Sequence, residues 1–428
     1  MNRRRTRPNW FRIILLCLLV LGGAYINRFI IAVQPSPFEP TATVTHAPEA
    51  FITQGEELFK EGKLIPAIDA YQQAIISRPA DPAIHVALAR VLVFAGQYDK
   101  AKTSAEDAIL LNPDSSMAHA VLAWALDFQG KYPEADNSIQ RAIQLDPNNA
   151  LAHAYYVEIL VDSFLSGIST FESIEKAIEE SKVAVALAPD TLETHRARGY
   201  ILEATANYEE AIREYQAAIA INPNIGDLHL ALGRNYRTLG IYDQAVLEFT
   251  NASALNSEDP TPDYLISRTY ATIGEYGKAM QYAESAMTKN PEDANLRGNL
   301  GVMYYRNGYW SEAVVELDYV VNGGFTEDGV QIEQIVLIPD PRIAEYYFTH
   351  GLALARLNRC GEALLVAQTI LARVPADELA VENANEINNR CQQNLNDGPT
   401  AVPTLSETDS VSTQSPDDLS GATPTPTP

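Results

Sequence analysis

The stretch Pro82 to Ser115 reads PAIHVALARVLVFAGQYDKAKTSAEDAILLNPDS, and most of the chain repeats its pattern. Apolar and small residues follow helical spacing in two runs, which are separated by GQYD at residues 96–99 and closed by Asn112 and Pro113. Breaks that contain Gly, Asn, Asp or Pro between two helical runs indicate turns. The stretch therefore predicts two short antiparallel helices.

Three positions of this stretch recur along the chain when Pro82 is counted as position 1. Alanine occupies position 20 in nine successive repeats: Ala67, Ala101, Ala135, Ala177, Ala211, Ala245, Ala279, Ala313 and Ala363. Position 8 is small in all repeats but the one with Val157: Gly55, Ala89, Ala123, Gly199, Gly233, Ser267, Gly301 and Gly351. Position 32 is proline except at Ser257 and Phe325: Pro79, Pro113, Pro147, Pro189, Pro223, Pro291 and Pro375. Small residues at fixed positions are expected where helices cross closely.

This pattern resembles the tetratricopeptide repeat, a unit of about 34 residues. The resemblance covers roughly residues 48 to 377 and implies an all-α, right-handed superhelical solenoid of about nine helix-turn-helix repeats with a C-terminal capping helix. It also implies a protein-binding or peptide-binding scaffold. The sequence contains no nucleophile elbow, phosphate-binding loop or paired acid–base carboxylates, so we predict a protein that is not an enzyme and needs no cofactor.

The repeats divide the chain into segments with different expected roles. We assign repeats 1–8 to residues 48–327, an insertion to 328–343, repeat 9 to 344–377 and the capping helix to 378–395. A further insertion of about eight residues in the fourth repeat predicts a longer first helix or a protruding loop. The insertion at 328–343 is expected either to fold back on the array or to bind a partner. Residues 396–428 are rich in Pro, Thr and Ser, a composition that predicts a disordered tail.

The N-terminus has the charge pattern of a membrane anchor. Five arginines precede the apolar run that starts at Ile13, whereas only Arg28 follows it before residue 33. Extended to Val33, the apolar segment has about the 20 residues that a bilayer span requires. We therefore expect residues 1–33 to be a cytoplasmic basic tip and a single-pass signal anchor in the cytoplasmic membrane, with a cleaved signal peptide as the rival interpretation. Residues 34–47, rich in Pro and Thr, are expected to be a linker that leaves the repeats outside the membrane.

The overall charge narrows the choice of partners. With 55 acidic and 31 basic residues the net charge is −24. A chain this acidic repels phosphate backbones, so we expect no nucleic-acid binding.

Histidine stands at position 4 of five repeats, at His85, His119, His153, His195 and His229. Metal ligands must lie within about 2.1 Å of one ion, whereas stacked helices are about 8–10 Å apart. Histidines one repeat apart therefore cannot share an ion. Because position 4 carries a large packed ring in the family, we interpret these residues as packing residues and expect no metal site.

The resemblance also implies that the first helix of each repeat lines a concave groove. Its groove positions here carry basic and aromatic side chains, at Arg90, Trp124, Arg196, Tyr200, Arg234, Arg237, Arg268, Asn299, Tyr305 and Arg306. Arginine pairs bidentately with carboxylates, so the pattern indicates a protein or peptide ligand with acidic or C-terminal carboxylate groups. Acidic residues at other groove positions, such as Glu203 and Asp227, leave a second interpretation open, a charged face with internal ion pairs.

These inferences lead to one functional hypothesis and one alternative. We expect a scaffold that holds a membrane-associated assembly together on the extracytoplasmic side. The alternative is a groove that binds an acidic polysaccharide or cell-wall polymer during export. Binding that depends on peptide carboxylates would favour the scaffold, and competition by uronate polymers would favour the alternative.

Two of the three cysteines are placed to form a bond. Cys360 lies at the start of the second helix of repeat 9, and Cys391 lies in the capping helix, which stacking returns to the same corner. In an exported protein the pair is expected to oxidise, closing a loop of about thirty residues that stabilises the fold by roughly 3–4 kcal/mol. If the chain stayed in the cytosol, two buried thiols would be expected instead.

Overall fold

The structure is a computed structural model that describes residues 9–26, 28 and 48–396. The predicted basic tip, the linker, the C-terminal tail and part of the predicted anchor lie outside the described residues. The chain divides into two compact bodies, residues 1–187 and 188–428, which are called the N-terminal and C-terminal bodies here.

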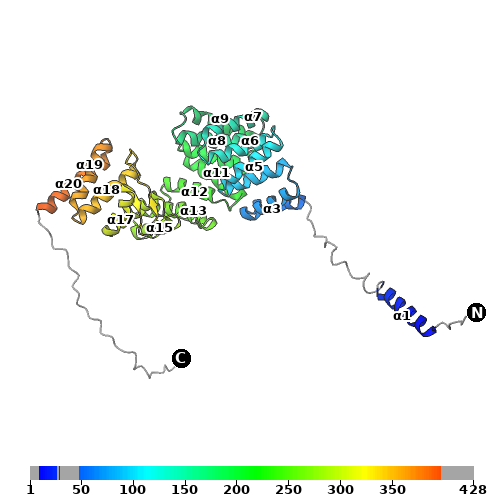
Figure 1. Ribbon diagram of the computed structural model, residues 1–428. Coiled ribbons are helices and arrows are strands. Elements are labelled where there is room, and N and C mark those ends of the chain that lie inside the picture. Colours follow the sequence, from blue (N-terminus) through cyan, green and yellow to red (C-terminus); the bar gives the residue numbers. More distant parts are fainter. Residues whose placement is uncertain (1–8, 27, 29–47, 397–428) are drawn as a thin grey trace, which may run out of the picture. The chain divides into compact units, whose positions relative to one another are not determined.

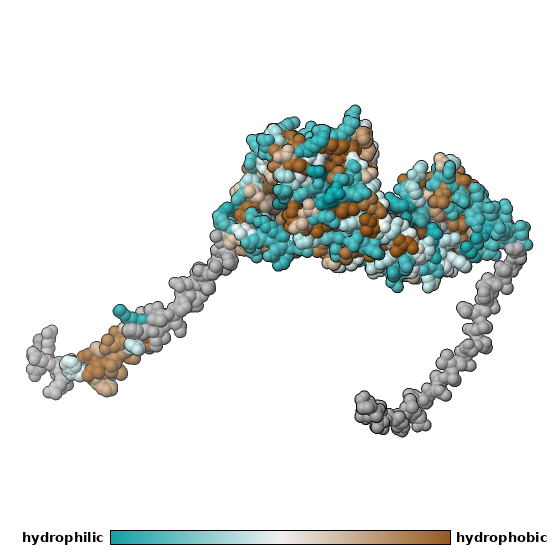
Figure 2. Space-filling view, turned by 180° about the vertical axis from the view of Figure 1, so that it is seen from behind, coloured by the Kyte–Doolittle hydropathy of each residue, from teal (hydrophilic) through white to brown (hydrophobic). Residues whose placement is uncertain are grey.

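Helix α1 (Trp10–Ile26) is apolar over its 17 residues. Its large side chains are exposed, from Ile13 at 45% to Phe11 at 76%, and Figure 2 shows them as a hydrophobic surface along the helix. In the part of the chain that the structure describes, no helix combines the length and the apolarity that crossing a membrane requires.

The N-terminal body continues with four helix hairpins, whose antiparallel helices lie side by side in Figure 1. The hairpins are α2 (Pro48–Lys60) with α3 (Leu64–Ser77), α4 (Pro82–Phe94) with α5 (Tyr98–Leu111), α6 (Ser116–Asp127) with α7 (Tyr132–Leu145), and α8 (Ala150–Leu165) with α9 (Glu172–Leu187). Each hairpin contacts the next one along the chain. This is the stacked helix-turn-helix arrangement that the sequence predicts.

The C-terminal body repeats the same arrangement and ends with a single helix. Its hairpins are α10 (Leu192–Ala204) with α11 (Tyr208–Ile221), α12 (Gly226–Thr238) with α13 (Tyr242–Leu255), α14 (Thr261–Thr272) with α15 (Tyr276–Lys289), α16 (Ala294–Arg306) with α17 (Trp310–Asn322), and α18 (Pro341–Arg356) with α19 (Cys360–Arg373). Helix α20 (Glu378–Asn396) packs on both α18 and α19. The prediction of an all-α solenoid with a capping helix is confirmed.

The small residues of the repeat explain how the hairpins close. All nine alanines at position 20 have an exposed fraction of 0%. A longer side chain at such a position would push the two helices apart, because protein interiors are packed as densely as organic crystals. The first helix then ends where position 15 adopts a left-handed conformation, for example at Gly96 with φ 70°. Glycine adopts this conformation without a steric penalty, which permits the tight turn into the second helix.

The insertion in the fourth repeat produces both of the expected features. Helix α8 runs to Leu165, three residues past the end that the shorter α4 would predict, and residues 166–171 then form a loop before α9. Three large apolar side chains at this loop, Leu165, Ile168 and Phe171, are 58–63% exposed. The loop therefore presents apolar surface beside the helices that it connects.

The second insertion folds back on the array. Strands β1 (Gly324–Phe325) and β2 (Gln331–Ile332) pair antiparallel, so this hairpin spans both sides of the predicted boundary at residue 328. Ile332 and Leu337 are buried. The backbone N–H of Ile335 donates to the Val320 carbonyl at 2.9 Å, and the Tyr347 hydroxyl donates to the Ile335 carbonyl at 2.8 Å. The interior of this segment thus completes the packing between α17 and α18.

Candidate functional site

Four of the five histidines at position 4 form a hydrogen bond that connects the first helix to the turn before it. Nε2 of His85, His119, His153 and His229 lies 2.9–3.2 Å from the carbonyl oxygen of the position 32 proline of the preceding repeat. Arg297 stands at position 4 of a later repeat, and its Nε donates to the Pro291 carbonyl at 3.0 Å. A ring or guanidinium N–H thus ties each of these first helices to the turn before it.

Three of the position 4 histidines pair with a glutamate of the following second helix. Nδ1 of His153 lies 2.5 Å from Glu180, Nδ1 of His195 lies 2.7 Å from Glu214, and Nδ1 of His229 lies 2.6 Å from Glu248. The hydrogen bond from His153 to Glu180 raises the pKa of His153. Burial lowers the pKa of His229, but the hydrogen bonds to Glu248 and to the Pro223 carbonyl outweigh burial, so the net shift is upward. Within the described residues, no group of three or more His, Cys, Asp or Glu side chains could hold a metal ion.

The predicted groove residues of the N-terminal body are packed against aromatic rings. The guanidinium carbon of Arg90 lies 4.8 Å from the centroid of the Phe59 ring. Trp124 has an exposed fraction of 0%, stacks on Tyr155 with 4.2 Å between ring centroids, and donates from Nε1 to Glu158 at 2.8 Å. Trp124 therefore cannot contact a ligand in this conformation, and its assignment as a groove residue is corrected to a core residue.

Three predicted groove arginines of the C-terminal body each form an ion pair with a carboxylate on the first helix of another hairpin. Arg196 pairs with Asp227 at 2.8 Å, Arg234 with Glu203 at 3.0 Å, and Arg268 with Glu345 at 2.8 Å. Burial lowers the pKa of Arg268, but Glu345 raises it by more, so the cation is strongly held. For these three residues the structure therefore agrees with the interpretation of the groove as a charged face with internal ion pairs.

Arg237 differs from the three paired arginines. Its side chain is half-buried, and no carboxylate of the described residues lies within ion-pairing distance of it. Burial lowers the pKa of Arg237, Tyr264 opposes this shift, and the neighbouring charges of Arg268 and Arg234 lower the pKa further. We call Arg234, Arg237, Arg268 and Tyr264 the arginine cluster. Glu203 and Glu345 pair with Arg234 and Arg268, so Arg237 is the arginine of the cluster without an ion pair among the described residues.

The remaining predicted residues of the C-terminal body have mixed roles. Asn299 is 1% exposed and donates from Nδ2 to Ser267 Oγ at 2.9 Å, which makes it a core residue rather than a ligand contact. Tyr200 and Tyr305 are half-buried, and Arg306 is exposed with its guanidinium carbon 5.9 Å from the Tyr276 ring centroid. Tyr200, Tyr305 and Arg306 are therefore accessible, whereas Asn299 is not.

Sequence reasoning missed two members of this surface, Tyr264 and Glu345. Both stand at groove positions, 5 and 2 of their repeats, so the repeat register could have identified them. The pairing of Glu345 with Arg268 could not be deduced, because the insertion at residues 328–343 breaks the spacing between repeats 8 and 9.

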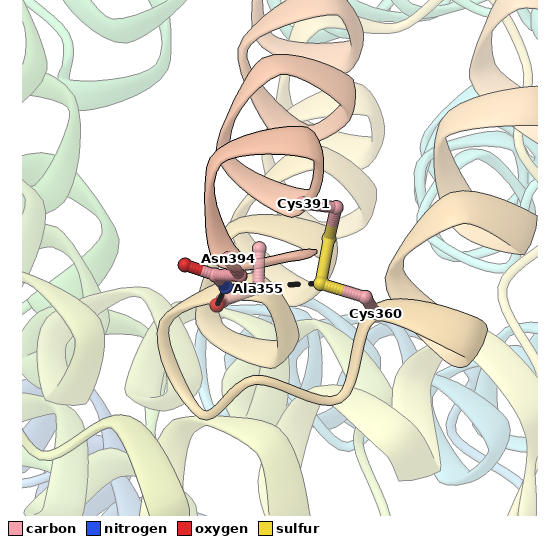
Figure 3. Close-up of a disulfide and its surroundings, with 4 residues drawn as sticks. All are labelled: Ala355, Cys360, Cys391 and Asn394. Carbon is pink, nitrogen blue, oxygen red and sulfur yellow. Dashed lines mark hydrogen bonds between the residues drawn. A yellow bond between two sulfur atoms is a disulfide. The ribbon is translucent and has the colours of Figure 1, made fainter. Parts of the chain in front are cut away.

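The two cysteines singled out in the sequence are joined by a disulfide. Their Cα atoms are 5.4 Å apart, and Figure 3 shows the bond linking the start of α19 to α20. Nδ2 of Asn394 donates to the Ala355 carbonyl oxygen at 2.9 Å and lies 3.7 Å from Cys360 Sγ. Three elements, α18, α19 and α20, are thus tied together at one corner.

Comparisons with known proteins agree with this architecture. Models of the tetratricopeptide repeat match residues 58–125, 118–149 and 192–225. No curated protein matches the sequence. The chain belongs to the tetratricopeptide repeat family, whose members generally serve as non-catalytic scaffolds for binding proteins.

Several solved structures are similar to parts of this chain. A structure from the functional characterization of Pseudomonas aeruginosa pilF is 20% identical, covering 48% of this chain and 90% of that one, with a TM-score of 0.40. PilW, a type IV pilus biogenesis factor, is 21% identical, covering 48% and 91%, with a TM-score of 0.42. A tetratricopeptide repeat protein from Parabacteroides merdae is 16% identical, covering 64% and 99%, with a TM-score of 0.44.

Proposed function

We propose that this protein is a non-catalytic scaffold that binds a partner protein through the arginine cluster and holds a membrane-associated assembly on the extracytoplasmic side. The observation that carries the proposal is Arg237, a half-buried guanidinium between two other arginines without a carboxylate partner among the described residues. Bringing like charges together costs free energy, and a ligand carboxylate that enters the cluster recovers part of that cost.

The partner chemistry follows from the donors that the cluster offers. A guanidinium presents several N–H donors in a planar fork that matches a carboxylate. Arg234 and Arg268 already form ion pairs with Glu203 and Glu345, and these pairs fix the orientation of both side chains. Arg237 is therefore the arginine that is available to bind an added anion. We therefore propose that Arg237 binds a carboxylate of the partner, from either an acidic side chain or the C-terminus.

A charge reversal with a matched control tests the site. Full-length wild type, Arg237→Glu and Arg213→Glu are used to capture proteins from solubilised membranes of the producing organism. Arg213 lies on α11, and its side chain is 63% exposed and pairs with Glu210, so its reversal makes the same change in net charge elsewhere. Proteins retained by wild type and Arg213→Glu but lost with Arg237→Glu support the proposal, and an identical set from all three variants contradicts it.

Competition then identifies the ligand class. Peptides that end in a free carboxylate should release the captured proteins, whereas the same peptides with an amidated C-terminus and no acidic side chain should not. Release by polyuronate but not by carboxylate peptides would replace the scaffold proposal with the polysaccharide alternative.

The location is the second part of the proposal. Its support is the arginine-rich start of the sequence followed by the apolar helix α1, whose large apolar side chains are exposed. The test fuses alkaline phosphatase or green fluorescent protein after residue 396. Phosphatase activity in membrane pellets that resists carbonate extraction supports an anchored, exported array. Fluorescence without phosphatase activity, or release into the soluble fraction, contradicts it.

A further inference from the structure

The insertion in the fourth repeat creates a pocket in the N-terminal body. The pocket has a volume of about 510 Å³, within the range of about 300–1,000 Å³ that is typical of small-molecule sites. Helices α7, α8 and α9 form its floor and two walls, and the inserted loop supplies the rest through Ile168, Ser169 and Thr170. These three helices lie next to one another in Figure 1. The pocket shares no residue with the arginine cluster.

A fixed network of polar groups lines the floor. Tyr156 is 2% exposed, and its hydroxyl donates to Asp136 Oδ1 at 2.9 Å. The Lys176 ammonium donates to the same hydroxyl oxygen, and Gln140 Nε2 donates to Asp136 Oδ2 at 2.7 Å. Burial and the Asp136 carboxylate raise the pKa of Tyr156, so the group remains a neutral phenol. The network is therefore ordered before any ligand enters.

Some hydrogen-bond donors and acceptors of the pocket are not used by these bonds. Ser169 Oγ is shielded from solvent and has no hydrogen-bond partner among the described residues, a state that costs about 1–3 kcal/mol. An ammonium has three donors and a carboxylate about four acceptor sites, so Lys176 and Asp136 are not saturated. The lining therefore offers both hydrogen-bond donors and acceptors, next to the apolar side chains of Ile159 and Leu160.

The presence of both positive and negative side chains in the lining disfavours a ligand that carries a net charge. A cationic ligand would meet the Lys176 ammonium, whose Nζ already lies 4.4 Å from the centroid of the Tyr156 ring. An anionic ligand would meet Asp136 and Glu172, two carboxylates in the same lining. A hydroxyl group both donates and accepts, so a ligand with several hydroxyls and an apolar ring face can satisfy both sets. The half-buried ring of Tyr132 at the rim adds an aromatic surface for such a face.

We propose that the pocket bounded by Tyr156, Asp136, Lys176 and the loop residue Ser169 binds one neutral sugar residue. The residue is either a free monosaccharide or one unit of a glycan chain, because both present the same ring to the pocket. This site is independent of protein binding at the arginine cluster, so either can fail without the other.

Saturation-transfer NMR with defined sugars tests the proposal. The full-length protein is kept in a detergent without sugar headgroups and mixed with N-acetylglucosamine, glucose, glucosamine or glucuronic acid. Saturation transfer to a neutral sugar that exceeds transfer to glucosamine and glucuronic acid is expected. A longer oligomer of the best neutral sugar separates the two sources, since stronger binding of the oligomer identifies a glycan and equal binding a free sugar. Absence of transfer to both neutral sugars, or a preference for a charged one, overturns the proposal.

Two variants locate the binding. Ser173→Trp places a large ring among the lining residues, whereas Val183→Trp makes the same enlargement at an exposed position of α9 outside the pocket. Loss of the signal only in Ser173→Trp supports the site, and equal signals in both variants overturn it. Ser169→Ala removes the shielded hydroxyl without adding bulk and is informative even if the tryptophan variant fails to fold. It should weaken binding about tenfold while leaving the thermal midpoint unchanged or raised. Unchanged binding in this variant overturns the role of Ser169.

Discussion

The ring of Phe249 in α13 lies directly over Gly233 in α12. A Cβ atom added at Gly233 would be 2.5 Å from Cε1 of this ring, and Phe249 has an exposed fraction of 0%. The same relationship between positions 8 and 24 joins Gly55 to Tyr71, Gly199 to Tyr215 and Gly301 to Leu317. Glycine at position 8 therefore compensates for a large residue at position 24, which explains why the small residue recurs.

This pairing predicts that Gly233→Ala lowers the free energy of unfolding by about 1–3 kcal/mol, the usual cost of overpacking a dense core. The control is Gly277→Ala in α15, where an added Cβ meets no atom within 4 Å. In the control, alanine should leave stability unchanged or raise it by up to about 1 kcal/mol, because it is the better helix former. Urea unfolding followed by circular dichroism measures both. Equal effects of the two substitutions would show that Phe249 can move aside.

A buried histidine near the end of the array predicts a loss of stability in acid. His350 is 2% exposed, neither ring nitrogen has a hydrogen-bond partner in the described residues, and burial lowers the pKa of His350 to about 4. Asp318 on α17 and Glu362 on α19 raise this pKa while Arg359 lowers it, but burial dominates. The unfolded chain takes up a proton near pH 6.5, whereas the folded chain does not do so until about pH 4. The contribution of His350 to stability is therefore present above pH 6.5 and is lost as the pH falls from 6.5 to about 4.

Replacing His350 by leucine, which stands at the same repeat position in Leu88, tests this inference. Between about pH 7.5 and pH 5, wild type should lose about 2 kcal/mol more stability than His350→Leu. The raised pKa values of His153 and His229 act in the opposite direction, but they are common to both proteins and cancel in the comparison. Thermal unfolding at the two pH values measures the difference, and parallel shifts in the two proteins would exclude His350 as the cause.

The fold could be predicted from the sequence because a small residue recurs at the same position of every helix hairpin. Ala101 and its eight equivalents are all fully buried, as a close helix crossing requires. The partners in the ion pairs could be predicted from the repeat spacing in one case and not in another. Arg234 meets Glu203, 31 residues earlier, so its partner lies almost one repeat away and the spacing could have indicated it. Arg268 meets Glu345 at a separation of 77 residues, across an insertion whose path no spacing rule describes.

The burial of Trp124 could not be predicted from its repeat position either. Arg90 and Arg234 hold the equivalent position 9 and are only partly buried. Trp124 is covered because its neighbours are aromatic: Phe94 lies 4.9 Å away and Tyr155 4.2 Å away between ring centroids. The register fixes the direction of a side chain, but the side chains of the adjacent repeats decide whether it remains exposed.

The disulfide between Cys360 and Cys391 predicts a specific labelling pattern. Alkylation of the native protein should leave Cys360 and Cys391 unmodified, and reduction followed by alkylation should add two further groups, one on each of these cysteines. Intact mass measures the number of added groups. Three modified cysteines without reduction would contradict the disulfide.

The energetic effect of this bond should be local. The loop spans a separation of 31 residues, so removing the bond by Cys360→Ala with Cys391→Ala should cost about 3–4 kcal/mol. Stability in a repeat array is a sum of repeats and nearest-neighbour interfaces, so the loss should appear first in α20, whose residues Ala380, Ala384 and Ile387 cover the last hairpin. Hydrogen exchange should therefore accelerate in α18–α20 and remain unchanged in α2–α9, with Cys17→Ser as the control. Acceleration throughout both bodies would mean instead that the chain unfolds as one cooperative unit and that the bond stabilises every repeat.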